Sequence, residues 1–298
     1  MNKLSHLRAI GFAILGFTLW VLGDSAIKWS GQSELPLYEI VAILSSFGAL
    51  ALFVKNLLRH EIKSLWPRQP RKQLARASLE LGNVLFIVIA LRHLSLTMFY
   101  IIVFTAPLAI TLLAALILHE HFSLRKALAV LGGFAGVVIA VNPWGYSTQG
   151  DWIGYTACAV CVTCFSSNIV WLRRMTQTET PESLVFFSDA ARAALCGCFM
   201  LWHAAPITIP LLLGLAAAGI FGAVGDIFTF FALKHTTAAN VSQYHYTQLV
   251  TGALIGYLVW HEVPSVSMLI GAAIIVTAGL YIAGRARKAD SLAAIGTR

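Results

Sequence analysis

The sequence is short of charged residues. Asp, Glu, Lys and Arg together make up 11% of the 298 residues, whereas 58% are hydrophobic. A soluble domain carries about 25% charged residues, so a water-soluble fold, a disordered chain and a coiled coil are excluded. A helix that crosses the hydrocarbon core needs about 20 mostly apolar residues. The composition therefore predicts an all-α integral membrane protein that spans the lipid bilayer.

The sequence also lacks the usual marks of an enzyme. It has no Gly-x-Ser-x-Gly motif and no phosphate-binding glycine loop, and His119-Glu120-His121 does not have the spacing of a helical zinc motif. The five cysteines all lie in apolar stretches, where we expect small packing residues and no disulfide framework. We therefore expect no enzyme activity, no metal and no cofactor.

Ten apolar stretches are long enough to be membrane spans. They lie at 9–27, 36–54, 75–91, 96–118, 126–142, 152–172, 183–203, 208–233, 237–260 and 265–284. No short core with a small-residue cleavage site follows the N-terminus, so the first span is predicted to be retained. The connecting segments are short, which favours neighbouring helices packed as antiparallel hairpins.

The basic residues predict the orientation of these spans. The net charge is +8, but the basic residues are spread between spans and do not form one face, so a nucleic-acid partner is not expected. With both termini inside, 18 Lys and Arg residues fall on the cytoplasmic side and only Lys28 and Arg92 fall outside. Seven of the 18, Arg76 among them, belong to the second loop. This asymmetry predicts a multi-pass protein of the cytoplasmic membrane with both termini cytoplasmic.

An internal repeat divides the chain into two halves. Ala90-Leu91-Arg92-His93 recurs as Ala232-Leu233-Lys234-His235, and at the same offset His119-Glu120 recurs as His261-Glu262. The repeats are predicted at 1–145 and 146–298, with five spans each. Because five is odd, the second copy enters the membrane inverted, and inverted repeats around a central cavity are typical of secondary transporters.

These features resemble the EamA-type members of the drug/metabolite transporter superfamily. The similarity rests on Ser95 and Pro107 in the stretch from Leu94 to Glu120, on Thr237–Glu262 followed by Pro264-Ser265, and on Trp20 and Lys28 near the end of the first span. It implies ten transmembrane helices as two inverted five-helix repeats, with helices five and ten beside the bundle. Pro107 has no counterpart in the ninth span. The resemblance also implies an exporter of amino acids, aromatic ones included, or a carrier of another small metabolite or drug, working by alternating access; we expect a monomer or a homodimer.

Ionisable residues inside spans are candidates for the substrate site, because they are costly there and face a cavity or a partner. Arg192 and Asp226 lie well inside the seventh and eighth spans. Arg192 suits a substrate carboxylate and Asp226 an ammonium group; alternatively, Arg192 pairs with Asp189 or Asp226 and holds helices together. Glu80 is expected near the membrane interface.

Further candidates come from polar residues within the apolar spans. Asn240, Tyr244, Gln248 and Thr251 recur at helical spacing in the ninth span, and either line a cavity or bond a neighbouring helix. Asn83 and Tyr100 are the corresponding residues of the first half. Trp20 and Asp24 lie near the outer end of the first span, where Asp24 is also four residues from Lys28, the spacing of a local ion pair.

Overall fold

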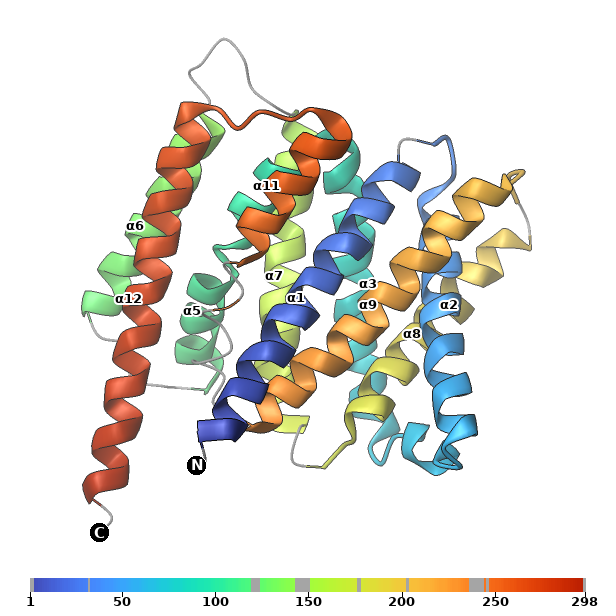
Figure 1. Cartoon of the computed structure of the whole chain (residues 1–298), viewed down its shortest axis with the longest axis horizontal. Coiled ribbons are helices and arrows are strands. Elements are labelled where there is room, and N and C mark those ends of the chain that lie inside the picture. Colours follow the sequence, from blue (N-terminus) through green and yellow to red (C-terminus); the bar gives the residue numbers. More distant parts are fainter. Residues whose placement is uncertain are drawn as a thin grey trace.

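The computed structural model describes residues 3–31, 33–118, 124–142, 151–175, 178–201, 204–235, 244 and 247–296. In these ranges the chain is helical and contains no strand. The helices form an elongated bundle with the N- and C-termini at the same end (Figure 1). We call this the terminal end and the other the opposite end.

Each predicted span contains at least one helix; the fourth span holds two, and several ends differ from the predicted ones by up to about twelve residues. The elements are α1 Lys3–Gly31, α2 Leu37–Leu58, η1 Ile62–Leu65, α3 Pro70–His93, α4 Leu96–Val103, α5 Ala106–Leu118, α6 Leu124–Val141, α7 Trp152–Met175, α8 Pro181–Met200, α9 Ile209–His235, α11 Thr247–Trp260 and α12 Val266–Gly296. By length and composition, α1, α2, α3, α7, α8 and α9 can each cross a membrane, and shorter apolar helices accompany them. The inverted relation of two five-helix repeats stays a prediction.

The fourth span is broken into two helices. Proline has no N–H and its ring clashes with the carbonyl one turn earlier, so Pro107 stops α4 at Val103 and starts α5 at Ala106. The Ile102 carbonyl accepts hydrogen bonds from the backbone N–H and the hydroxyl of Thr105, at 3.0 and 2.6 Å. The break therefore leaves this carbonyl satisfied inside an apolar bundle.

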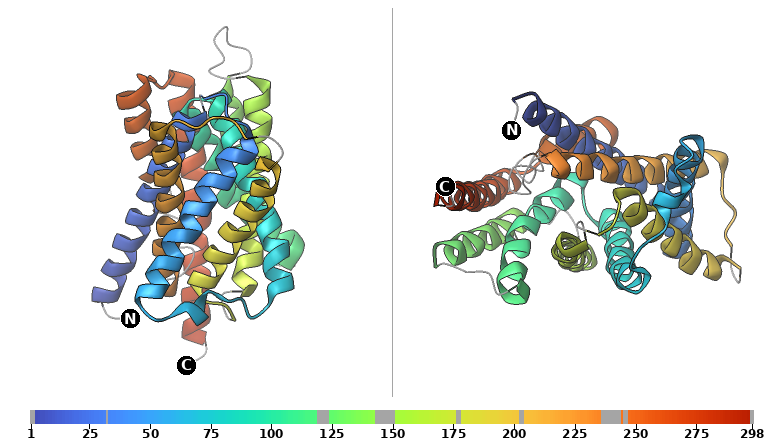
Figure 2. Two further views of the ribbon diagram at one scale, coloured as in Figure 1. Left: turned by 90° about the vertical axis from the view of Figure 1, so that its right-hand side faces the viewer. Right: turned by 90° about the horizontal axis from the view of Figure 1, so that it is seen from below.

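The main helix pairs combine the two halves of the chain. The helix α1 packs along α9, α2 along α8, α3 along α7, and α6 along α12. The α6–α12 pair stands at one side of the bundle (Figure 2). This exchange brings residues that are more than 80 positions apart in the sequence into the same interior, which is where the charged side chains lie.

Candidate substrate-binding site

A charged cluster joins α3 to α7 and α8. Arg76 is 2% exposed and pairs with Glu80; it also donates to Asn168 Oδ1 at 3.3 Å. Its Nη2 donates to the Leu184 carbonyl and to Ser188 Oγ, both at 2.6 Å. The prediction that Arg76 belongs to the second loop is therefore wrong. The helix α3 begins at Pro70, five residues before the predicted span, and α8 supplies acceptors that no local pattern indicates.

Glu80 lies at the centre of this cluster. Its carboxylate pairs with Arg76, accepts from Arg192 Nη1 at 3.3 Å and accepts from the Asn168 amide at 3.2 Å. The expectation that Glu80 sits at the membrane interface is therefore corrected. Two guanidinium groups compensate the cost of burying this carboxylate in the bundle.

Arg192 is held by three protein groups. Its Nη2 pairs with Asp189, Nη1 with Glu80, and Nε donates to Ser45 Oγ at 3.3 Å. The planar fork that could hold a substrate carboxylate bidentately is thus occupied. This geometry agrees with the interpretation in which Arg192 joins helices, and a role in substrate binding stays a prediction.

Asp226 is different from the acids of that cluster. It is half-buried on α9, and within the described part of the chain it forms no hydrogen bond and no ion pair. One helical turn earlier, a Cβ added at Gly222 would meet no atom within 4 Å. Gly222 therefore lies beside open space, and Asp226 is within electrostatic range of Arg192 but forms no ion pair with it or with another described residue.

Asp24 on α1 accepts a hydrogen bond from Tyr100 Oη at 2.7 Å. Tyr100 comes from α4 and is only 1% exposed. The predicted local ion pair between Asp24 and Lys28 does not form, because Lys28 binds groups from other helices. Asp24, like Asp226, thus has no cationic partner in the described chain.

Two aromatic rings, from α1 and α7, meet near these carboxylates in the sequence of α1 and α9. Trp20 is one turn from Asp24, and its ring meets Phe165 of α7 edge-on, with the centroids 6.4 Å apart. A Cβ at Gly225, next to Asp226 in the chain, would come within 2.5 Å of Trp20 Cδ1. Glycine at 225 therefore lets the indole ring approach the backbone of α9 closely.

The polar residues of the ninth span are only partly described. The helix α11 covers Thr247–Trp260, and Asn240 lies outside the described residues, so a face shared by all four stays a prediction. Gln248 donates to the Phe17 carbonyl of α1 at 3.2 Å, which is the interhelical alternative. Thr251 bonds carbonyls of its own helix, and Tyr244 packs against a small apolar cluster that includes Phe17.

Asn83 lies on α3 and faces α7. Its Oδ1 accepts from Cys161 Sγ at 3.1 Å, so this cysteine has a polar contact as well as a packing role. In the described ranges, no group of three or more His, Cys, Asp and Glu side chains could hold a metal ion. The thiols that recur at every third position of α7 therefore do not gather a metal-ligand set there.

An ion pair between Lys28 and Glu262 closes the opposite end of the bundle. Lys28 also donates to the Leu94 carbonyl at 3.2 Å and lies 5.0 Å from the centre of the Trp260 ring. Glu262 Oε2 accepts the Leu96 N–H at 2.9 Å, at the start of α4. A cavity of about 550 Å³ lies beside the pair, with a lining that includes Arg92, His93 and His261. We call this arrangement the α1–α11 latch.

The bundle therefore combines apolar helices long enough to cross a membrane with charged and aromatic groups in its interior. The EamA-like transporter family model matches residues 7–142 and again residues 152–284. The chain belongs to this family, and it is a membrane transporter of small metabolites.

Curated relatives extend over most of the chain at low identity. An S-adenosylmethionine uptake transporter of Rickettsia felis is 24% identical over 96% of both chains. The pseudopaline exporter CntI of Pseudomonas aeruginosa is 25% identical over 89% of this chain and 92% of its own. A riboflavin transporter of Brucella anthropi is 23% identical over 86% and 92%. These names support transport of small metabolites and do not single out the amino-acid exporter branch.

A solved crystal structure supports the fold. It matches 93% of this chain and 98% of its own with a TM-score of 0.66, at 22% sequence identity. At that identity the likeness concerns the arrangement of helices alone.

Proposed function

We propose that this protein is a secondary carrier for a small metabolite that bears a cationic group and an aromatic or apolar part. The substrate binds between α1, α7 and α9, with Asp24 and Asp226 toward its positive group and Trp20 and Phe165 against its ring. Amino acids with aromatic side chains fit this class, as does S-adenosylmethionine, which carries a sulfonium, an amine and an adenine ring.

The absence of a direct ion pair to Asp24 or Asp226 in the described chain carries this proposal. A carboxylate in a poorly hydrated interior is heavily penalised unless a positive charge or several donors meet it. The buried arginines are already paired with Glu80 and Asp189. A cationic substrate would supply the charge that these two positions lack.

The aromatic pair supports the same class of substrate. A cation near the face of Trp or Phe gains electrostatic energy from the ring quadrupole, and a planar ring stacks on it. For an amino acid, the carboxylate would need Arg192, and Arg192 would have to release Ser45 or Glu80 to accept it. The same requirement holds for S-adenosylmethionine, which also carries a carboxylate, so cationic metabolites that have no carboxylate fit this site best.

Alternating access in this proposal uses the α1–α11 latch as the closed gate at the opposite end. Breaking it frees α1 and α11. The charged cluster of Arg76, Glu80, Asp189 and Arg192, which we call the α3–α8 cluster, keeps the rest of the bundle together. Two matches of one family model in the chain support two related halves, 1–145 and 146–298, which move against each other.

The test uses purified full-length protein in sealed liposomes. Uptake of labelled S-adenosylmethionine, tryptophan and riboflavin is measured without ATP, with and without the same compound inside. Saturable uptake of a cationic compound that internal compound accelerates is expected for a carrier, since a channel shows no such acceleration. If only neutral or anionic compounds move, the substrate class is wrong; if nothing moves by counterflow, the carrier mechanism is wrong.

Orientation is tested by thiol labelling in cells. In a Cys198→Ser background, the exposed positions Glu34 and Arg59 lie on loops at the opposite and terminal ends. If both termini are cytoplasmic, an impermeant maleimide labels Glu34→Cys and spares Arg59→Cys. The reverse pattern would overturn the predicted orientation.

A further inference from the structure

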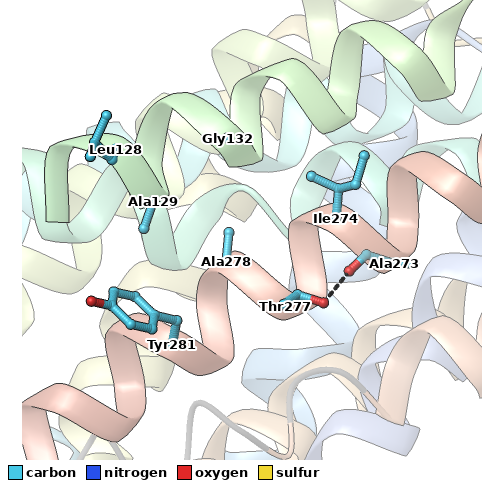
Figure 3. Close-up of a pocket in the computed structure, with 8 residues that line it drawn as sticks. All are labelled: Leu128, Ala129, Gly132, Ala273, Ile274, Thr277, Ala278 and Tyr281. Carbon is cyan, nitrogen blue, oxygen red and sulfur yellow. Dashed lines mark hydrogen bonds between the residues drawn. The ribbon is translucent and has the colours of Figure 1, made fainter. Parts of the chain in front are cut away.

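A groove of about 560 Å³ runs between α6 and α12, away from the charged interior (Figure 3). Leu128, Ala129 and Gly132 line it from α6. Ala273, Ile274, Thr277, Ala278 and Tyr281 line it from α12. The groove therefore lies on the helix pair that stands beside the bundle, where the surface faces lipid.

The groove opens where the contact between the two helices ends. Toward the opposite end the backbones touch, because a Cβ at Gly271 would lie 2.4 Å from the Gly136 carbonyl. One turn nearer the terminal end, a Cβ at Gly132 would meet nothing within 4 Å. The helices thus diverge toward the terminal end and leave a slot between them.

The groove is lined mainly by apolar side chains. Thr277 donates its hydroxyl to the Ala273 carbonyl of its own helix at 2.7 Å. Tyr281 is 43% exposed and lies at the end of the groove nearest the chain termini, the depth at which tyrosines meet lipid head groups. An alkyl chain suits such a surface.

The terminal end of the same helix pair is strongly basic. Arg125 and Lys126 lie in the first turn of α6, and Arg285, Arg287 and Lys288 follow Tyr281 on α12, with Asp290 the one acid of these two helices. Five positive charges and one negative charge give this end a net charge of +4. Basic residues between transmembrane helices at the membrane surface attract anionic lipid head groups.

We propose that the α6–α12 groove is a binding site for an anionic phospholipid. One acyl chain lies in the slot between Gly132 and Ala278, and the phosphate lies at the basic end beyond Tyr281. This site is independent of the substrate proposal, because none of its residues lies in the interior.

Full-length protein in neutral detergent tests the site by thermal unfolding with dioleoylphosphatidylglycerol or dioleoylphosphatidylcholine added. The anionic lipid is expected to raise Tm by about 5 °C and the zwitterionic lipid by about 1 °C or less. Gly132→Leu fills the slot and should abolish the difference. Gly197→Leu on α8, where a Cβ also meets nothing within 4 Å, is the matched control and should keep it. Arg285→Gln with Lys288→Gln should reduce it.

Equal shifts with both lipids, or a full shift in the Gly132→Leu protein, would overturn the proposal. A second outcome would also overturn it: the wild type is a dimer, Gly132→Leu makes it a monomer, and Tm does not depend on the lipid. The groove would then be an interface with a second copy of the chain. If Gly132→Leu does not fold, native mass spectrometry of the wild type and of the Arg285→Gln/Lys288→Gln protein decides. Retained phosphatidylglycerol on the wild type alone supports the site, and equal retention or none refutes it.

Discussion

The α3–α8 cluster and the α1–α9 contact both bury charge, but they do so in opposite ways. In the cluster, the charged groups of Arg76, Glu80, Asp189 and Arg192 all meet opposite charges from neighbouring positions. Along α1 and α9, Asp24 has a single tyrosine hydroxyl and Asp226 has no described partner. A network in which every charge is paired thus holds helices together, whereas unpaired carboxylates can still gain energy by binding a ligand.

The cluster should therefore carry the larger effect on stability. Glu80→Leu leaves two buried guanidinium groups without their shared carboxylate, and we expect a loss of about 3–5 kcal/mol in the free energy of unfolding. Thermal unfolding of the purified protein in detergent measures it. A Tm equal to that of the wild type would mean that water or lipid head groups already solvate these arginines.

Arg192 is a candidate both for binding the substrate and for joining helices, so its variants distinguish the two roles. If it holds helices, Arg192→Ala destabilises the protein by about 3 kcal/mol, and adding Asp189→Ala recovers part of this loss because it removes the unpaired carboxylate. Unfolding and substrate affinity are measured on the same proteins. A well-folded Arg192→Ala protein with weakened amino-acid binding would return Arg192 to the substrate site.

Asp226→Asn should show the opposite profile. We expect substrate affinity to fall by about tenfold or more, with a Tm no lower than that of the wild type, because the change removes a buried charge that has no described partner. Glu34→Gln, which removes an exposed carboxylate from a loop, is the matched control and should change neither quantity. Lower stability with unchanged affinity would place Asp226 among the structural charges.

Breaking the α1–α11 latch should destabilise the protein less than the loss of Glu80 and more than the loss of Asp226. Glu262→Gln removes the charge opposite Lys28 but retains an amide oxygen for the Leu96 N–H, so we expect a loss of about 1–2 kcal/mol. The maximal transport rate should change more than the apparent affinity, because the latch gates the cavity and does not line the proposed site. A change in affinity alone would contradict the gating role.

The smallest effect is expected at the exposed pair of His93 and Asp151. The Gly154 N–H donates to Asp151 at 2.9 Å and lowers the pKa of this carboxylate, and His93 lowers it further. Because the pKa of this carboxylate is lower in the folded state, the carboxylate stabilises the protein at pH values above its usual pKa of 3.8. This stabilisation is lost as the pH falls through the folded-state pKa. Asp151→Asn should thus lower Tm slightly at neutral pH, and it should have no effect once the pH lies well below the folded-state pKa of Asp151. A difference that persists in acid would have another cause.

Hydropathy by itself determined the protein class and the approximate positions of most described helices. It does so because each span must bury its own backbone hydrogen bonds in lipid, which makes a span a local property of about 20 residues. Pro107 likewise fixed the break in the fourth span through its missing N–H. The family resemblance could be read from the same local features, and the family match bears it out.

Only the tertiary structure decided which charges are partners. Asp24 and Lys28 have the spacing of a helical ion pair, yet Asp24 binds Tyr100 and Lys28 binds Glu262, 234 positions away. Arg76 and Glu80 belong to a network completed by α7 and α8, and no pattern within α3 indicates that network. Side-chain pairing in a membrane depends on which helices pack together. A buried charge pairs with an opposite charge or a hydrogen-bonding group that is close in space, even when that group is far away in the sequence.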